Sequence, residues 1–469
     1  MSEILIPALM VVAAMLAALG LVVGAAEVGR IWRRTQTHPM VYLIVVMLVS
    51  AALAVLLSGR NFSSMADDVI DTAAPTNAVV VWITRLSSLF IVFAALERIY
   101  QQQLRRAGAT KPPLFMLLTF VVYWVCAIAL PSVLSTHPIF LHDYTYTLFL
   151  GIGVCLVTPQ DSQRSVTLAR NSFVVFMLAS LALIPIRPDL VLDFNYSQGI
   201  LGTFPRFAGL SSHANVLGPF CVLGLLFVWV QPFDKPWINR LAWAVLLVCL
   251  VWSQSKTSWT SFTLCTVWLL AYRHARPAAR WLANERNHLG TALLLGTCMA
   301  VIFLLAAALW VADFSTVVDA FLASRVGNQV STMTGRDLIW ATAIKEWHAS
   351  PIFGYGPTLF DEVHRAAIGM DFATHGHNQV LDTLARSGTV GAFGLGLFAI
   401  TLFSRAILAV RRTGGLSVAL MIVLVFLAIG EVPFNIVNYG PENLCVWLLM
   451  LVLCGYQTKT SVVAAPAGP

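Results

Sequence analysis

The chain has 469 residues, of which 58% are hydrophobic and only 11% are charged, and its mean hydropathy is +0.79. This balance excludes a soluble globular protein and indicates an integral membrane protein that crosses the bilayer many times. The formal net charge of +7 is no argument for a nucleic-acid partner, because most basic residues lie in short connections between apolar segments. We predict no nucleic-acid binding.

Apolar runs of about 20 residues are long enough to cross about 30 Å of hydrocarbon as helices. About thirteen such runs begin near Ile4, Met40, Ala78, Leu114, Tyr144, Asn171, His213, Leu241, Thr257, Leu289, Thr389, Leu416 and Pro441. The first run lacks the basic start and small-residue cleavage site of a signal peptide, so we interpret it as a retained span. We predict an all-α polytopic protein with about 12–13 transmembrane helices, one membrane domain over residues 1–462 and a disordered tail over 463–469.

Basic residues favour cytoplasmic connections, and here they follow every second span. They are Arg30, Arg33, Arg34, Arg98, Arg105, Arg106, Lys111, Arg164, Arg170, Lys235, Arg240, Arg273, Arg276, Arg280, Arg286, Arg405, Arg411, Arg412 and Lys459. The other connections are then expected to face the periplasm. All eight cysteines fall in apolar runs, so the sequence predicts no disulfide framework.

Basic residues on the outer side need a different explanation. Arg206 lies in GTFPRFAGLSSHAN and Lys256 in the turn WSQSKTSW, both at the expected outer boundary. A cation there can bind a lipid phosphate, and arginine can do so with two hydrogen bonds. The alternative is that these side chains only reach ordinary phospholipid headgroups.

The longest outer connection, residues 313–388 between the tenth and eleventh spans, is predicted to be helical. A first helix from Arg336 has an apolar stripe, and we expect it to lie on the membrane with Trp340 and Trp347 at headgroup depth. It should end at Pro351, before a short helix over about 358–368. A third helix is expected over about 377–387, capped by Gly388. Together these helices would cover the outer mouth of the bundle.

His377 stands at the expected start of that third helix. The positive end of a helix disfavours imidazolium, and a neutral imidazole can accept a proton. The amide groups at the same helix start can bind an anion. The alternative is a histidine that only caps the helix or anchors it at the interface.

The pattern His377-Asn378, nine residues, Gly388-Thr-Val-Gly391 resembles the H-[NSQ]-x9-G-x-x-G signature of the O-antigen ligase and Wzy-type polymerase superfamily, which also includes protein O-oligosaccharyltransferases. The segments TGRDLIW, SPIFGYGPTLF and FPRFAGLSSHAN, at residues 334–340, 350–360 and 204–215, are similar to recurring segments of that family. The span count is one above the usual ligase arrangement.

The resemblance implies a glycosyltransferase in the cytoplasmic membrane that moves a glycan from undecaprenyl diphosphate to a glycan- or lipid-linked acceptor hydroxyl on the periplasmic side. It implies that Arg206 and Arg336 bind the diphosphate, with Lys256 as a weaker ligand, and that His377 is the base or orients the acceptor. Asn378, Gly388 and Gly391 would support the site. No metal or cofactor is expected, because arginines can balance the leaving charge. Membrane lipids and other polysaccharide-assembly membrane proteins are expected partners.

Glu431 and two charged residues of the third helix lie outside the signature. Glu431, in AIGEVPFNIVNYGPEN, is expected to pair with an arginine of the site, to orient the acceptor, or to form a structural ion pair. Asp382 and Arg386 have the spacing of an ion pair on a helix surface.

Several alternatives stay open. Asp67 and Asp68 in the first outer connection resemble the acidic pair of metal-dependent multi-span glycosyltransferases. A zinc site could use His364, His375 and His377. A flippase or transporter could bind the same lipid, although no paired interrupted spans indicate inverted repeats. Among the glycosyltransferases a polymerase is favoured over a ligase, since no outer connection suggests a lipid A- or protein-binding domain.

Overall fold

The computed structural model describes residues 38–62, 77–104, 113–196, 204–282, 336–370 and 373–458, with isolated helical positions between 292 and 303. The expected span beginning near Ile4, all but these isolated positions of the span beginning near Leu289, the residues Asp67 and Asp68, and the tail over 463–469 lie outside the described residues. The same holds for residues 313–335 of the long connection.

The described part is an all-α polytopic membrane protein, as predicted. Five helical segments are long and apolar enough to cross a membrane: Pro39–Leu57 (η1 and α2), Ala78–Gln102 in α3 (Ala78–Leu104), Leu114–Leu134 (α4, η2 and α5), Pro159–Ala182 (α7) and Gln379–Leu408 (α17). Shorter apolar helices are α6 (Tyr144–Cys155), α9 (Ala214–Val230), α10 (Pro236–Trp252), α19 (Leu416–Gly430) and η4 with α20 (Pro441–Leu453). The long helix α11 covers Lys256–Leu282. Apart from the two outside the described residues, every expected run coincides with a helix.

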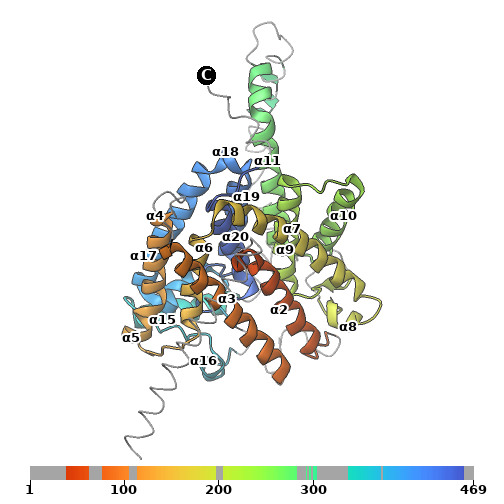
Figure 1. Cartoon of the computed structure of the whole chain (residues 1–469). Coiled ribbons are helices and arrows are strands. Elements are labelled where there is room, and N and C mark those ends of the chain that lie inside the picture. Colours follow the sequence, from red (N-terminus) through yellow and green to blue (C-terminus); the bar gives the residue numbers. More distant parts are fainter. Residues whose placement is uncertain are drawn as a thin grey trace, which may run out of the picture.

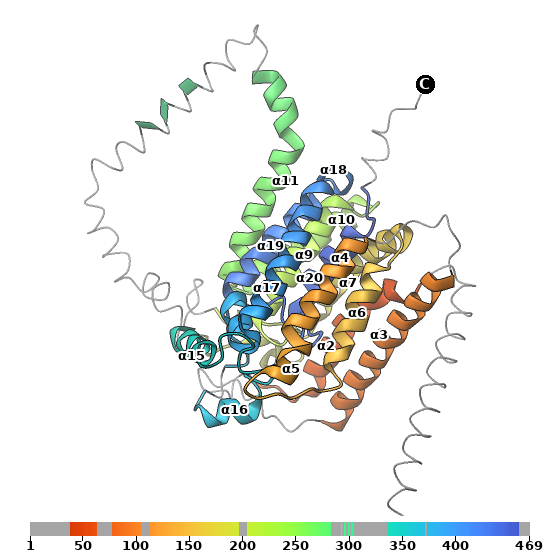
Figure 2. The ribbon, with the colours of Figure 1, turned by 90° about the vertical axis from the view of Figure 1, so that its left-hand side faces the viewer.

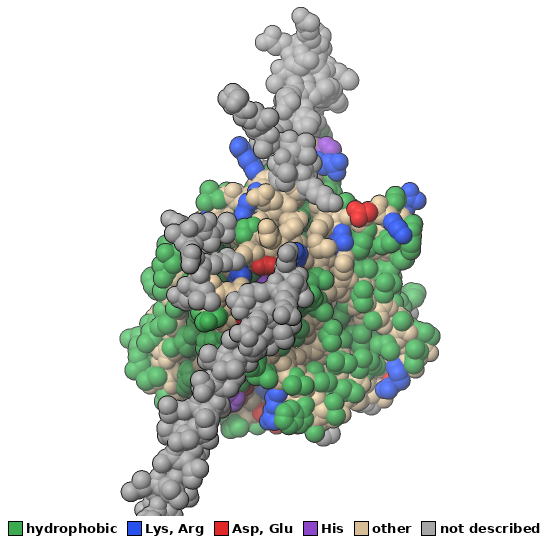
Figure 3. Space-filling model, viewed as in Figure 1, with side chains coloured by type: hydrophobic (Ala, Val, Ile, Leu, Met, Phe, Trp, Pro, Cys, Tyr) green, Lys and Arg blue, Asp and Glu red, His purple; other side chains and the backbone are tan. Residues whose placement is uncertain are grey.

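The helices pack as a bundle around α20 (Leu444–Leu453), all of whose residues are buried. Its neighbours α6, α7 and α19 contact it directly, and α17 lies beside α4 (Leu114–Trp124) in both views (Figures 1 and 2). Hydrophobic side chains cover the middle of the face in Figure 3, while Lys and Arg side chains gather mostly toward its two ends. This distribution is what a helix bundle immersed in lipid requires.

The two ends of the bundle carry different structures. One end holds α18 (Val410–Thr413), with Arg411 and Arg412, and the opposite end holds α15 (Arg336–Ala349) and α16 (Glu362–Ala367) (Figures 1 and 2). The predicted helical connection therefore lies on the side opposite the basic loop at 411–412, as alternating orientation of the spans requires.

The helices α15 and α16 pack partly against other segments of the protein. This corrects the expectation that the apolar stripe of α15 lies on the membrane. Ile339 and Ala343 are buried in a small second core with Tyr355, Leu359, Phe360, Met370, Ala373 and Ala385. Trp340 Nε1 donates a hydrogen bond to the Gly376 carbonyl at 3.0 Å. Because the stripe finds protein partners, part of it is not available to headgroups.

Helix α17 (Gln379–Leu408) merges the expected third helix with the eleventh span. The break predicted at Gly388 is present, with φ 61° and ψ −162°, but the helix resumes immediately beyond it. Its N-cap is Asn378, whose Oδ1 accepts hydrogen bonds from the Val380 and Leu381 amides, so His377 lies just outside the helix and not at its first position. The dipole argument for His377 is weakened accordingly, since the effect falls off within one turn.

A short two-stranded sheet carries Arg206. A short helix α8 (Pro188–Val191) leads into strand β1 (Leu192–Asp193), which pairs antiparallel with β2 (Arg206–Phe207), with Asp193 opposite Arg206.

Arg170, expected in a cytoplasmic connection, instead lies within α7, because that helix begins at Pro159, well before the expected span. Its Nη1 donates to the carbonyls of Gln231 and Pro232.

Candidate functional site

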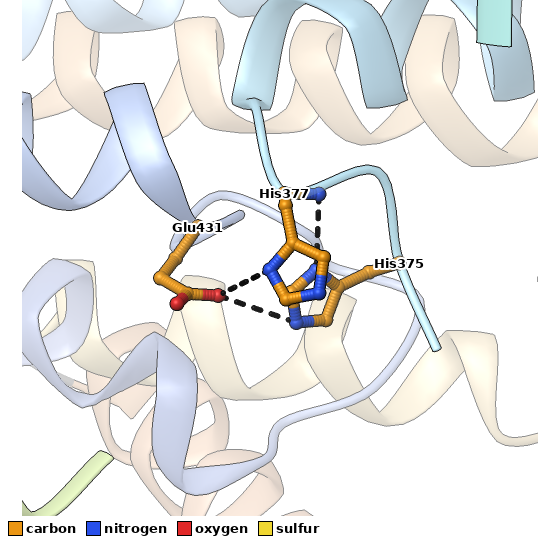
Figure 4. A group of neighbouring side chains, drawn as sticks. All are labelled: His375, His377 and Glu431. Atoms are coloured by element: carbon orange, nitrogen blue, oxygen red, sulfur yellow. Dashed lines mark hydrogen bonds and ion pairs between the residues drawn. The ribbon is translucent and has the colours of Figure 1, made fainter. Parts of the chain in front are cut away.

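Glu431 lies at the centre of a cluster of charged and polar side chains at the α15 end of the bundle. Its Oε2 is 3.2 Å from His377 Nδ1 and 3.4 Å from His375 Nε2 (Figure 4). Its Oε1 is 3.4 Å from Arg336 Nη2. The carboxylate comes from the C-cap of α19, the histidines from the turn before α17 and the arginine from the first residue of α15. Three segments far apart in the sequence therefore meet at one side chain.

The turn that carries both histidines has an unusual backbone. His377 has φ 45°, in the left-handed region that residues with a Cβ rarely adopt. Its amide donates to His375 Nδ1 at 3.2 Å, and the two ring centroids are 4.0 Å apart. Such a conformation costs of order 1–3 kcal/mol and persists only where surrounding contacts hold it, which is common at functional sites.

Arg206 reaches the same cluster through one intermediate residue. Its Nη2 donates to Asn215 Oδ1 at 2.5 Å, and Asn215 Nδ2 lies 3.4 Å from Glu431 Oε1. Its Nε donates to the Ser253 carbonyl at 2.8 Å, and its guanidinium lies over the Tyr196 ring, 4.3 Å from the centroid. The buried Arg206 and the partly exposed Arg336 thus flank Glu431.

Lys256 is the first residue of α11, three positions after the Ser253 carbonyl that Arg206 binds. The start of α11 also lies near Arg336, because both are close to Gly430 at the end of α19. A methyl group placed on Gly430 would lie 3.1 Å from Arg336 Nη1 and 3.8 Å from Thr257 Oγ1. The three predicted diphosphate ligands therefore belong to segments that surround the end of α19.

The remaining residues of the signature have conformational roles in this fold. Asn378 caps α17. A Cβ at Gly388 would lie 2.2 Å from the Ile352 carbonyl oxygen, and a Cβ at Gly391 would lie 2.2 Å from Ser387 Cβ. Both positions require glycine because neighbouring atoms approach so closely.

The charges in the cluster follow from its geometry. Burial would raise the pKa of Glu431, but the hydrogen bond from His377 and the charges of His375, His377 and Arg336 together lower it to about 2. Burial, and next the charge of His377, lowers the pKa of His375 to about 4. At neutral pH Glu431 is therefore an anion and His375 is neutral, which leaves the carboxylate able to orient His377 and to balance a positive charge on it.

A metal ion is a second possibility for these side chains. One ligand atom each from His375, His377 and Glu431 lies within 4.8 Å of the others, which is compatible with a shared ion. The Arg336 guanidinium on the other Glu431 oxygen opposes a cation there. His364, the third residue of the zinc alternative, stands apart from the other two and packs against Tyr355, with ring centroids 4.2 Å apart.

Sequence reasoning missed two features of the site. The first is Asn215, which links Arg206 to Glu431. We predicted no role for it from the sequence, although a polar amide in the same segment as Arg206, FPRFAGLSSHAN, could have indicated one. The expectation that Asp382 and Arg386 form a pair on the helix surface is wrong: the pair exists, but both side chains are buried, at 3% and 8% exposure.

Comparison with known proteins yields two matches. A family model described as O-antigen ligase matches residues 241–396, a stretch that contains Lys256, Arg336 and His377 but neither Arg206 nor Glu431. The exopolysaccharide production protein ExoQ of Rhizobium meliloti (strain 1021) is 27% identical over 274 residues, which are 54% of this chain and 58% of that relative. The alignment thus spans little more than half of the relative. Both matches support the resemblance of this chain to the O-antigen ligase and Wzy-type polymerase superfamily.

Proposed function

We propose that this protein is a glycosyltransferase of the polymerase or ligase type. It takes a glycan from undecaprenyl diphosphate and attaches it to an acceptor sugar hydroxyl on the periplasmic side of the cytoplasmic membrane. The observation that carries the proposal is the cluster around Glu431, in which one carboxylate contacts the predicted base His377 and the predicted diphosphate ligand Arg336. Arg206 joins the same cluster through Asn215.

Each member of the cluster has a role in this reaction. Arg206 and Arg336 bind the diphosphate and stabilise the negative charge that it gains as a leaving group. Lys256 adds a weaker positive charge. The acceptor hydroxyl oxygen attacks the anomeric carbon, the bond from that carbon to the diphosphate oxygen breaks, and the hydroxyl proton passes to His377.

The orientation of His377 identifies the nitrogen that would accept this proton. Its Nδ1 faces Glu431 at 3.2 Å, so in the tautomer that donates from Nδ1 the lone pair is on Nε2. The anionic Glu431 then stabilises the imidazolium that forms, as a carboxylate does in hydrolase triads. Because two arginines supply positive charge, the mechanism uses no metal ion, and transfer should persist in EDTA.

A polymerase that joins repeat units on one lipid carrier is the activity we favour. The relative from Rhizobium is named for exopolysaccharide production and not for lipopolysaccharide, which supports this choice over ligation to a lipid A core. A ligase or a protein O-oligosaccharyltransferase would use the same donor half of the site.

A deletion strain tests the proposal. We expect electrophoresis of its surface glycan to show single repeats on the normal anchor. Long chains left on undecaprenyl diphosphate would instead indicate a ligase. If lipid-linked glycan accumulated on the inner leaflet, the protein would be a flippase and the proposal would be wrong.

A further inference from the structure

Asp382 and Arg386 form a buried ion pair on the first part of α17, next to the turn that carries His375 and His377. Arg386 Nε lies 3.1 Å from Asp382 Oδ2, and the two side chains are only 8% and 3% exposed. Removing both charges from water is costly, and an apolar pair of similar size is often as stable. The contacts of the pair indicate what it does here.

Asp382 holds the peptide between the two histidines. Its Oδ1 accepts a hydrogen bond from the Gly376 amide at 2.9 Å. From the other side, Trp340 Nε1 donates to the Gly376 carbonyl at 3.0 Å. A methyl group at Gly376 would lie 2.9 Å from Asp382 Cβ, so the turn rests directly on this residue. Gly376 is thereby fixed at its amide, at its carbonyl and at its Cα.

Arg386 in turn fixes Asp382 and joins α17 to the segment before α16. Its Nη1 donates to the Pro357 carbonyl at 2.5 Å, and its guanidinium lies over the Phe360 ring, 4.9 Å from the centroid. The Gly356 amide donates to the Arg386 carbonyl at 3.0 Å. The carboxylate of Asp382 is therefore held by a residue whose side chain and backbone are both fixed to the segment before α16.

We propose that Asp382, fixed by Arg386, is a positioning residue that keeps His377 in its strained conformation with Nδ1 directed at Glu431. The inference rests on the proposed function. Without the bond to Gly376, the backbone of His377 can relax from φ 45° to the more favourable negative region, and its ring would leave Glu431. A displacement of about 1 Å is enough to lower the rate of a positioned reaction about 100-fold.

The test compares two neutral double variants that differ only in the side chain at position 382. Asp382→Asn/Arg386→Gln keeps an oxygen that can accept from Gly376, and Asp382→Leu/Arg386→Gln has a similar volume but no acceptor. Purified proteins in vesicles are assayed with undecaprenyl-diphosphate-linked glycan isolated from a deletion strain. We expect the Asn variant to stay near wild type. In the Leu variant kcat should fall about 10- to 100-fold, with KM for the donor little changed.

A second measurement does not depend on activity. Diethylpyrocarbonate modifies accessible imidazoles, and mass spectrometry of the peptide around His377 gives the rate. We expect faster modification of His377 in the Leu variant than in the Asn variant or wild type. The matched control is Asp189→Asn, which alters the exposed pair with Arg187 and should change neither kcat nor modification.

The outcomes separate the two proposals. If the wild type is active and the Asn and Leu variants have equal kcat and equal rates of modification, Asp382 only stabilises the fold and the positioning role is wrong. If the wild type transfers no glycan but the Leu variant alone exposes His377, the positioning of the turn stands and the proposed function fails.

Discussion

The Glu431 side chain makes three contacts that the proposed mechanism uses. Its oxygens lie beside the His377 imidazole and the Arg336 guanidinium and, through Asn215, connect it to a second arginine. A buried carboxylate with this many cationic and donor neighbours remains ionised although burial disfavours its charge. Its contribution to catalysis and its contribution to stability can therefore be tested separately.

Replacing Glu431 by Gln tests its catalytic contribution. The amide keeps the shape and can still contact His377, but it cannot balance an imidazolium or the charge of Arg336. We expect kcat for glycan transfer to fall about 10²- to 10⁴-fold. The control is Glu362→Gln in α16, where a carboxylate is lost from an exposed position. An equal loss in both variants would argue against a specific role.

Acid should destabilise the site in two steps. The pKa of His375 is lowered to about 4 from 6.5, so the unfolded state binds its proton first, and stability present above pH 6.5 is lost as pH falls toward 4. The pKa of Glu431 is lowered from 4.5 to about 2, so its contribution is lost between those values. Thermal unfolding in detergent should show a declining midpoint over pH 6.5 to 4. Burial lowers the pKa of His213 to about 3, so His213 contributes to the same decline, and His375→Gln should make the decline shallower without removing it.

At the scale of single elements, α17 shows what the sequence could and could not predict. The break at Gly388 and the helices on both sides follow from the position of glycine within apolar and polar runs. The span predicted to begin near Thr389 is the part of α17 beyond the break, but the sequence did not reveal the close approach of Ile352 to Gly388, because Ile352 belongs to another segment. The buried position of Asp382 and Arg386 was missed for the same reason.

Gly388→Ala should be destabilising. The substitution places a Cβ 2.2 Å from the Ile352 carbonyl oxygen. The backbone there, with φ 61° and ψ −162°, is in a region that is essentially restricted to glycine and costs other residues about 1–3 kcal/mol. A lower midpoint of thermal unfolding in detergent and reduced glycan transfer are expected. Gly396→Ala is the matched control in the same helix, because no atom lies within 4 Å of its Cβ position. Equal midpoints for the two variants would contradict this account of the kink.

At the scale of the whole molecule, hydropathy predicted the bundle well because a membrane leaves the chain few alternatives to helices. Every expected span within the described residues is a helix, although α7 begins earlier than expected. The sequence also predicted that Glu431 pairs with an arginine of the site, and Glu431 pairs with Arg336. Arg206, Asn215 and Glu431 meet His377 only through tertiary packing, which spacing in one sequence does not encode.

The two ends of the bundle should lie on opposite sides of the membrane. Alkaline phosphatase is active only outside the cytoplasm, so a fusion within residues 358–368 should be active and a fusion after Thr413 in α18 should be inactive. Green fluorescent protein fused at the same positions should give the reverse pattern. An inactive phosphatase fusion within residues 358–368 would contradict the predicted orientation and move the site to the cytoplasm.

The most direct measurement is glycan transfer by the purified protein in vesicles, with Arg206→Ala, Arg336→Ala and His377→Ala assayed beside Arg187→Ala, an exposed arginine outside the cluster. We predict that each of the first three lowers kcat/KM about 10²-fold or more while Arg187→Ala does not, and that EDTA leaves wild-type transfer unchanged. Transfer at the wild-type rate after all three replacements would contradict the account.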